Sequence, residues 1–104
     1  MTQPVLADVA TERRRQDDLW GEQNHPDGTG LPAQVAAAEV ARAITDRSAE
    51  AGTLTWAEIL TEETTEALAE TDPAKLRDEL VQVAAVAAAW IEALDRRGVR
   101  SAGS

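Results

Sequence analysis

The sequence predicts an all-α protein, a four-helix bundle that oligomerisation completes. Apolar residues recur every three or four positions in four separate segments, and alanine, a strong helix former, is the dominant apolar residue. No segment shows the alternation of apolar and polar residues that is typical of a strand. We expect residues 1–104 to form one domain, with residues 1–3 and about 99–104 disordered. A domain of 104 residues has a thin core, which association would thicken.

The first two helices are separated by a strong loop signal. The first helix is expected over about residues 4–22, and it ends in residues 24–32, which contain two prolines, two glycines, Asn and Asp. The second is expected over residues 32–51, because Pro32 suits the first turn and Gly52 suits the cap after the last. We expect its apolar side to carry Val35, Val40 and Ile44.

The third and fourth helices are joined by a short break. Thr55, followed three residues later by Glu58, predicts a capping box at the start of a helix that ends near residue 71. The pair Asp72-Pro73 stops that helix and starts the next, with Asp72 as cap and Pro73 at the first position. The fourth helix is expected over about residues 73–97.

Several carboxylates of the third helix fall where a bundle helix normally carries leucine or isoleucine. At 100° per residue, the apolar stripe of this helix is defined by Trp56, Ile59, Leu60 and Ala67. Inside the same stripe lie Glu63, Glu66 and Glu70, with Glu62 at its edge. The third helix is therefore expected to turn acidic groups toward the core.

The fourth helix repeats this feature. Glu79 falls within the stripe that Leu76, Leu80 and Val83 define, and Gln82 lies on its flank. Because the turn between the two helices is tight, they are expected to be antiparallel neighbours. Their acidic groups would then face one another.

Facing carboxylates in a bundle require a cationic partner. Burying an unpaired carboxylate costs several kcal/mol and raises its pKa. The chain has one lysine and nine arginines, so a hard divalent cation such as Mg²⁺ or Mn²⁺ fits the need better than side chains do. Carboxylates on facing helices are a known way to build such a site. The alternative is that the apolar stripe is narrower than we define it, so that these carboxylates form a solvated acidic face.

The same residues carry a family resemblance. The third helix contains EETTE at residues 62–66, and the fourth contains ELVQ at residues 79–82. Trp56 precedes the first motif, and an apolar run follows the second. With these motifs, residues 53–94 resemble the MazG-like nucleoside triphosphate pyrophosphohydrolases. This all-α superfamily is related to the dimeric dUTPases. Its members carry E-E-x-x-E on one helix and E-x-x-D on the next. The run ERRRQDDLWGEQNHPDGTG is similar to a short MazG-like subgroup.

The resemblance implies an activity, a metal and a set of ligands. Members of the family use Mg²⁺, with Mn²⁺ as a substitute, to hydrolyse a nucleoside triphosphate to its monophosphate and pyrophosphate in nucleotide-pool house-cleaning. Carried over, the metal ligands are Glu63, Glu66 and Glu79, with Gln82 in the fourth place. The water would be oriented or deprotonated by Glu62 or Glu66. Because Gln82 replaces the expected Asp, the alternative is a non-catalytic module that binds a nucleotide or a protein partner.

The first helix and the loop after it supply candidate substrate contacts. Arg13 and Gln16 share the helical phase of Val9 and Trp20, so both are expected to face inward. Arg13 would hold a phosphate or pair with a core acid, and Gln16 would contact a base edge or a metal-bound water. Trp20 would stack on a nucleobase or simply pack. His25 would touch phosphates, cap the loop or lie in solvent.

Charge and hydropathy restrict the partners. The formal charge of −9 disfavours polymeric nucleic acid and anionic membranes, and the longest nearly uncharged run, residues 80–91, is too short to cross a bilayer. The N-terminal residues lack the pattern of a signal peptide, so we expect a cytoplasmic protein. An acidic mimic of nucleic acid is a weaker hypothesis, because the helical phases gather the acids inward. The alanine-rich fourth helix and the family both favour a homodimer or homotetramer.

Overall fold

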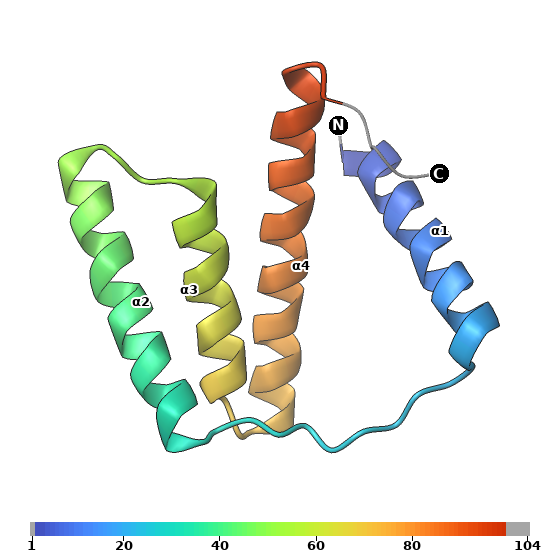
Figure 1. Cartoon of the computed structure of the whole chain (residues 1–104), viewed down its shortest axis with the longest axis horizontal. Coiled ribbons are helices and arrows are strands. Elements are labelled where there is room, and N and C mark those ends of the chain that lie inside the picture. Colours follow the sequence, from blue (N-terminus) through green and yellow to red (C-terminus); the bar gives the residue numbers. More distant parts are fainter. Residues whose placement is uncertain (1, 100–104) are drawn as a thin grey trace. The chain divides into compact units, whose positions relative to one another are not determined.

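The chain is all-α in its computed structural model, which describes residues 2–99 (Figure 1). Within that range there are no strands, and the helices are α1 (Thr2–Trp20), α2 (Pro32–Ala51), α3 (Trp56–Ala69) and α4 (Pro73–Arg96). The predicted helical class and the four segments are confirmed, with α2 matching its expected bounds. Helix α1 starts at Thr2, so two of the three N-terminal residues expected to be disordered are helical. Met1 and residues 100–104 lie outside the described residues.

The chain divides into two compact units, with the boundary inside α4. One unit is Asp27–Ala87, which holds α2, α3 and the first half of α4. The other combines α1 and the residues up to Pro26 with those from Ala88 onward. The expectation of a single domain stays a prediction. None of the helices within residues 2–99 is long and apolar enough to cross a membrane.

Local capping explains where α2 begins and ends. Pro32 occupies the first turn, and the backbone N–H of Leu31 donates to Oε1 of Gln34 at 2.8 Å. The amide of Gln34 in turn donates to the carbonyl of Gly28 at 3.0 Å, which ties the preceding loop to the helix. Gly52 closes the helix in the left-handed region, at φ 73°, as its position predicts.

The capping box at the start of α3 is confirmed and also links α3 to α2. The Glu58 N–H donates to Oγ1 of Thr55 at 3.2 Å, and the Thr55 N–H donates to Oε1 of Glu58 at 3.0 Å. The other oxygen of Glu58 accepts from the Ser48 hydroxyl on α2 at 2.6 Å. These hydrogen bonds, that from Ser48 above all, hold the pKa of Glu58 below its ordinary value.

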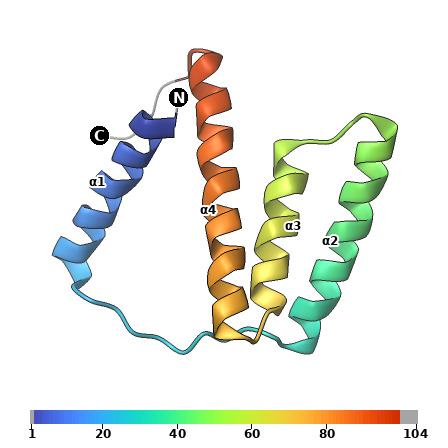
Figure 2. The same cartoon turned by 180° about the vertical axis from the view of Figure 1, so that it is seen from behind.

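The turn between α3 and α4 is held by two acidic side chains. Asp72 caps α4 as predicted, since its Oδ2 accepts from the Lys75 N–H at 3.0 Å. Glu70 accepts from the N–H groups of Thr71, at 2.9 Å, and Asp72, at 3.1 Å. The chain therefore reverses in three residues, and the first half of α4 runs antiparallel beside α3 (Figures 1 and 2).

Helix α2 packs on α3 through a face other than the expected one. Ala41 is only 7% exposed, and its neighbours at helical spacing, Ala38 and Thr45, are half-buried. The larger residues of the expected apolar side are all exposed: Val35, Val40 and Ile44. Small side chains let the two helix axes approach closely, and that contact decides which face of α2 is buried.

The buried set is small and rich in alanine. Among the described residues it comprises Val5, Ala41, Ala67, Leu76 and Ala88. Ala67 and Leu76 were predicted to lie on the buried stripes of their helices, and both do. Leu80, assigned to the same stripe of α4, is exposed. A core of this kind contributes little hydrophobic free energy per residue, so the caps and turns matter to the stability of the fold.

The loop before α2 is anchored on the end of α3 at Gly30. The Gly30 N–H donates to the carbonyl of Leu68 at 2.8 Å, and its φ of +82° is one that residues with a side chain rarely adopt. A Cβ at this position would collide with the Cγ2 atom of Thr71. Gly30 is therefore required both by its backbone conformation and by close contact.

This contact yields a prediction with a matched control. We expect Gly30→Ala to lower the free energy of unfolding by about 2 kcal/mol or more, from backbone strain together with steric overlap. Gly28→Ala, at φ +69° but with open space around the new Cβ, should cost only the strain, about 1 kcal/mol. Urea unfolding of the two variants measures the difference. Equal losses would mean that the loop does not rest on α3 as described.

Candidate metal centre

The acids predicted to face one another do converge. Glu63 and Glu66 project from α3 and Glu79 from α4, and one carboxylate oxygen of each lies within 4.8 Å of those of the other two. All three side chains are half-buried. The cluster lies entirely within the unit Asp27–Ala87, where the antiparallel turn brings the end of α3 beside the start of α4 (Figure 1).

The three carboxylates of the cluster repel one another. Burial raises the pKa of Glu63, and the neighbouring carboxylates of Glu66, Glu79 and Glu62 raise it further. Burial likewise raises the pKa of Glu79. The negative charges of Glu66, Glu70 and Asp78 and a hydrogen bond with Glu66 raise it further. Each ionised group therefore opposes folding at neutral pH, and a cation among them would relieve that cost.

Within the described part of the chain, one arginine pairs with the cluster. Nη2 of Arg42, on α2, lies 3.4 Å from Oε1 of Glu66. Arg42 and Glu66 line a pocket of ≈ 200 Å³, together with Ala38, Ala69, Glu70 and Glu79. Sequence reasoning missed Arg42 because it placed the wrong face of α2 inward. The spacing of four residues from Ala38 is the signal that could have found it.

The remaining acidic and amide candidates have distinct surroundings. Glu62 is half-buried and close enough to raise the pKa of Glu63, and its carboxylate has no partner among residues 2–99. Glu70 is engaged with backbone N–H groups of the turn, which makes it a structural cap. Gln82 lies one turn after Glu79 on α4 and is exposed. Its role as a fourth ligand stays a prediction.

The candidate substrate residues all belong to the other unit. Arg13 is held within α1, donating to Oε1 of Gln16 at 2.6 Å and to Oδ1 of Asp17 at 2.7 Å. Its acidic partner is thus on its own helix, not in the core. Trp20 is 61% exposed, and His25 lies in solvent with its Nε2 atom 3.3 Å from Oε1 of Gln23. Their roles toward a substrate stay predictions.

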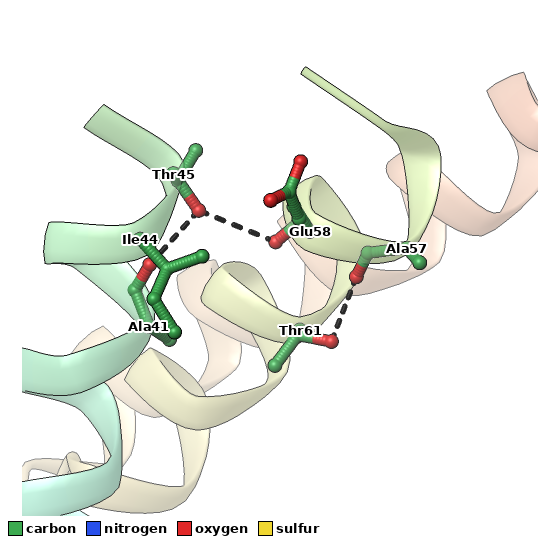
Figure 3. Close-up of a pocket in the computed structure, with 6 residues that line it drawn as sticks. All are labelled: Ala41, Ile44, Thr45, Ala57, Glu58 and Thr61. Atoms are coloured by element: carbon green, nitrogen blue, oxygen red, sulfur yellow. Dashed lines mark hydrogen bonds between the residues drawn. The ribbon is translucent and has the colours of Figure 1, made fainter. Parts of the chain in front are cut away.

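Two other pockets are less suited to chemistry. One, of ≈ 440 Å³, is lined by Arg13, Asp17, Gly21, Glu22 and Gln23, and its arginine is already paired. The other, of ≈ 230 Å³, is a mostly apolar groove between α2 and α3 (Figure 3). The hydroxyls of Thr45 and Thr61 donate to carbonyl oxygens there, so neither has a proton left to donate to a ligand.

The donor set fits a hard divalent cation. Octahedral Mg²⁺ binds oxygens at about 2.1 Å, which places neighbouring ligands about 3 Å apart and opposite ligands about 4 Å apart. Three carboxylate oxygens within 4.8 Å of one another need only small side-chain adjustments to reach those distances. Carboxylates without thiol or imidazole ligands favour Mg²⁺ or Mn²⁺ over zinc or copper.

Comparisons with protein-family models, with curated proteins and with solved structures found no match. The MazG-like resemblance therefore rests on the sequence motifs alone.

The variant Glu63→Leu separates a metal ligand from a merely solvated acid. In EDTA at pH 7 we expect it to raise the free energy of unfolding by about 1 kcal/mol, since water screens a half-exposed group but the like charges remain close. The gain should shrink as the pH falls toward the ordinary pKa of 4.5, because protonation removes the same repulsion in the wild type. Urea unfolding as a function of pH measures both effects.

Added Mg²⁺ should stabilise the wild type and leave Glu63→Leu unchanged. Glu39→Leu is the matched control, because it removes one charge from an exposed position of α2. That variant should gain stability from Mg²⁺ as the wild type does. Destabilisation of Glu63→Leu in EDTA, or an undiminished response to Mg²⁺, would exclude Glu63 from the site.

Proposed function

We propose that this chain is a Mg²⁺-dependent nucleoside triphosphate pyrophosphohydrolase of the MazG-like type. The observation that carries the proposal is the convergence of Glu63, Glu66 and Glu79. Helical phase places these three residues on the apolar stripes of their helices, together with Glu70, and the family motifs contain the same three. An acidic protein can handle an acidic substrate in this way, because a cation stands between the two sets of negative charge.

Each side chain has a distinct task in the proposed reaction. Glu63, Glu66 and Glu79 hold the ion, whose charge when bound offsets that of the phosphate oxygens. Glu62 lies beside the cluster and has no partner among residues 2–99, so it is the better of the two candidates to accept a proton from the attacking water. Glu66 is committed to the ion. Water attacks the α-phosphorus, and pyrophosphate leaves.

The proposal extends to assembly and place of action. Val35 and Val40 of α2 are exposed, which supports a homodimer or homotetramer in which further copies complete the bundle. House-cleaning of nucleotides in the cytoplasm is the corresponding biological role. The second candidate, a non-catalytic module, is favoured by one observation: Gln82 brings no charge to the place where the family has Asp.

Pyrophosphate release tests the proposal directly. The purified full chain is incubated with a panel of ribonucleoside and deoxyribonucleoside triphosphates, with Mg²⁺, with Mn²⁺ and with EDTA. We expect release from at least one nucleotide that depends on the metal. Glu79→Gln should lower the rate at least a hundredfold, since it removes a charged ligand, whereas Glu39→Gln should leave it unchanged.

The two candidates give different results in this assay. Gln82→Asp should raise the rate if the missing charge limits metal binding. Nucleotide-dependent thermal stabilisation without turnover, in the wild type and in Gln82→Asp, would support the binding module instead. Folded protein that neither turns over nor binds any nucleotide in the panel would contradict the pyrophosphohydrolase and the nucleotide-binding module, and would leave only a module that binds a protein partner.

A further inference from the structure

Arg42 is the basic residue of the unit Asp27–Ala87 that lies beside the acidic cluster. It lies on α2, its guanidinium reaches across to Glu66 on α3, and it is the one basic residue among those lining the acidic pocket. The two residues are 24 positions apart, so this ion pair is a tertiary contact and not a pairing within one helix. It brings one positive charge to a cluster of three acids.

The geometry of the pair indicates a loose contact. Its N–O distance is 3.4 Å, compared with 2.7 Å for the Arg13–Asp17 and Arg15–Glu12 pairs of α1. The Arg42 side chain is 65% exposed, whereas that of Glu66 is 23% exposed. An ion pair with one partner in solvent contributes little stability, so a divalent cation bound by three carboxylates would displace the guanidinium.

We propose that Arg42 is the counter-ion of the metal-free site and becomes its phosphate-binding residue when the metal binds. This inference rests on the proposed function. Binding of the divalent cation to Glu66 releases the guanidinium. The released group stays at the rim of the ≈ 200 Å³ pocket, beside the ion that Glu66 and Glu79 help to hold. A guanidinium binds phosphate oxygens through two parallel hydrogen bonds, so Arg42 and the ion together would hold a polyphosphate.

The metal arm of the test uses Mn²⁺ alone. Isothermal titration of the full chain compares the wild type with Arg42→Gln and with the control Arg47→Gln. Arg47 is exposed on the same helix and has no partner within residues 2–99, so its variant has the same net charge without the contact. We expect Arg42→Gln to bind Mn²⁺ about twofold to fivefold more tightly than Arg47→Gln, because the competing cation is gone.

The phosphate arm uses tripolyphosphate at saturating Mn²⁺. Here the order reverses, and Arg42→Gln should bind the metal complex of tripolyphosphate at least tenfold more weakly than Arg47→Gln. Arg42→Lys keeps the charge but loses the paired donors, so it should fall between them. Urea unfolding of each variant establishes that the chain is folded before titration.

The outcomes separate this inference from the proposed function. If the wild type binds Mn²⁺ and Arg42→Gln behaves like Arg47→Gln in both arms, the role of Arg42 is overturned while the metal site stands. Weaker Mn²⁺ binding by Arg42→Gln also overturns it, since that variant would then have lost a support of the site. A wild type that binds no Mn²⁺ contradicts both proposals.

Discussion

Mutual repulsion among three carboxylates is the constraint on which the site depends. Glu63, Glu66 and Glu79 hold oxygens within 4.8 Å of one another while half removed from water. Burial and like charge both raise the pKa of Glu63 and of Glu79, and Arg42 offsets the charge of the cluster only in part. A small domain with an alanine-rich core retains such a cluster at a cost to its stability, so a function that uses the charge is the simplest account of it.

The scaffold holds these groups together mainly through its turns. The three-residue reversal between α3 and α4 is fixed by Asp72 and by Glu70, which accept hydrogen bonds from backbone N–H groups. At the opposite end of α3, Glu58 joins the capping box to Ser48 of α2. Gly30 then seats the preceding loop on the end of α3. Because few large side chains are buried, these polar contacts determine the helix register that brings the carboxylates into range.

The helix bounds and the acidic triad were predictable because both depend on short-range signals. Proline, glycine and capping residues mark the helix ends, and helical phase with one tight turn places Glu79 opposite Glu63. The contact between Arg42 and Glu66 was not predicted, since it depends on which face of α2 packs. Hydrophobicity favoured the face of Val40, whereas close packing selected that of Ala41. The ion pair of Arg13 with Asp17 is by contrast a short-range contact, because the two residues lie four positions apart on one helix.

Titration of individual carboxyl groups by ¹³C NMR tests the central claim most directly. In EDTA, Glu63 and Glu79 should titrate above the ordinary pKa of 4.5, and Glu58 below it. Saturating Mg²⁺ should lower the pKa of Glu63 and of Glu79, because the ion competes with their protons, and leave that of Glu58 unchanged. Ordinary pKa values for Glu63 and Glu79, with no response to Mg²⁺, would contradict the account.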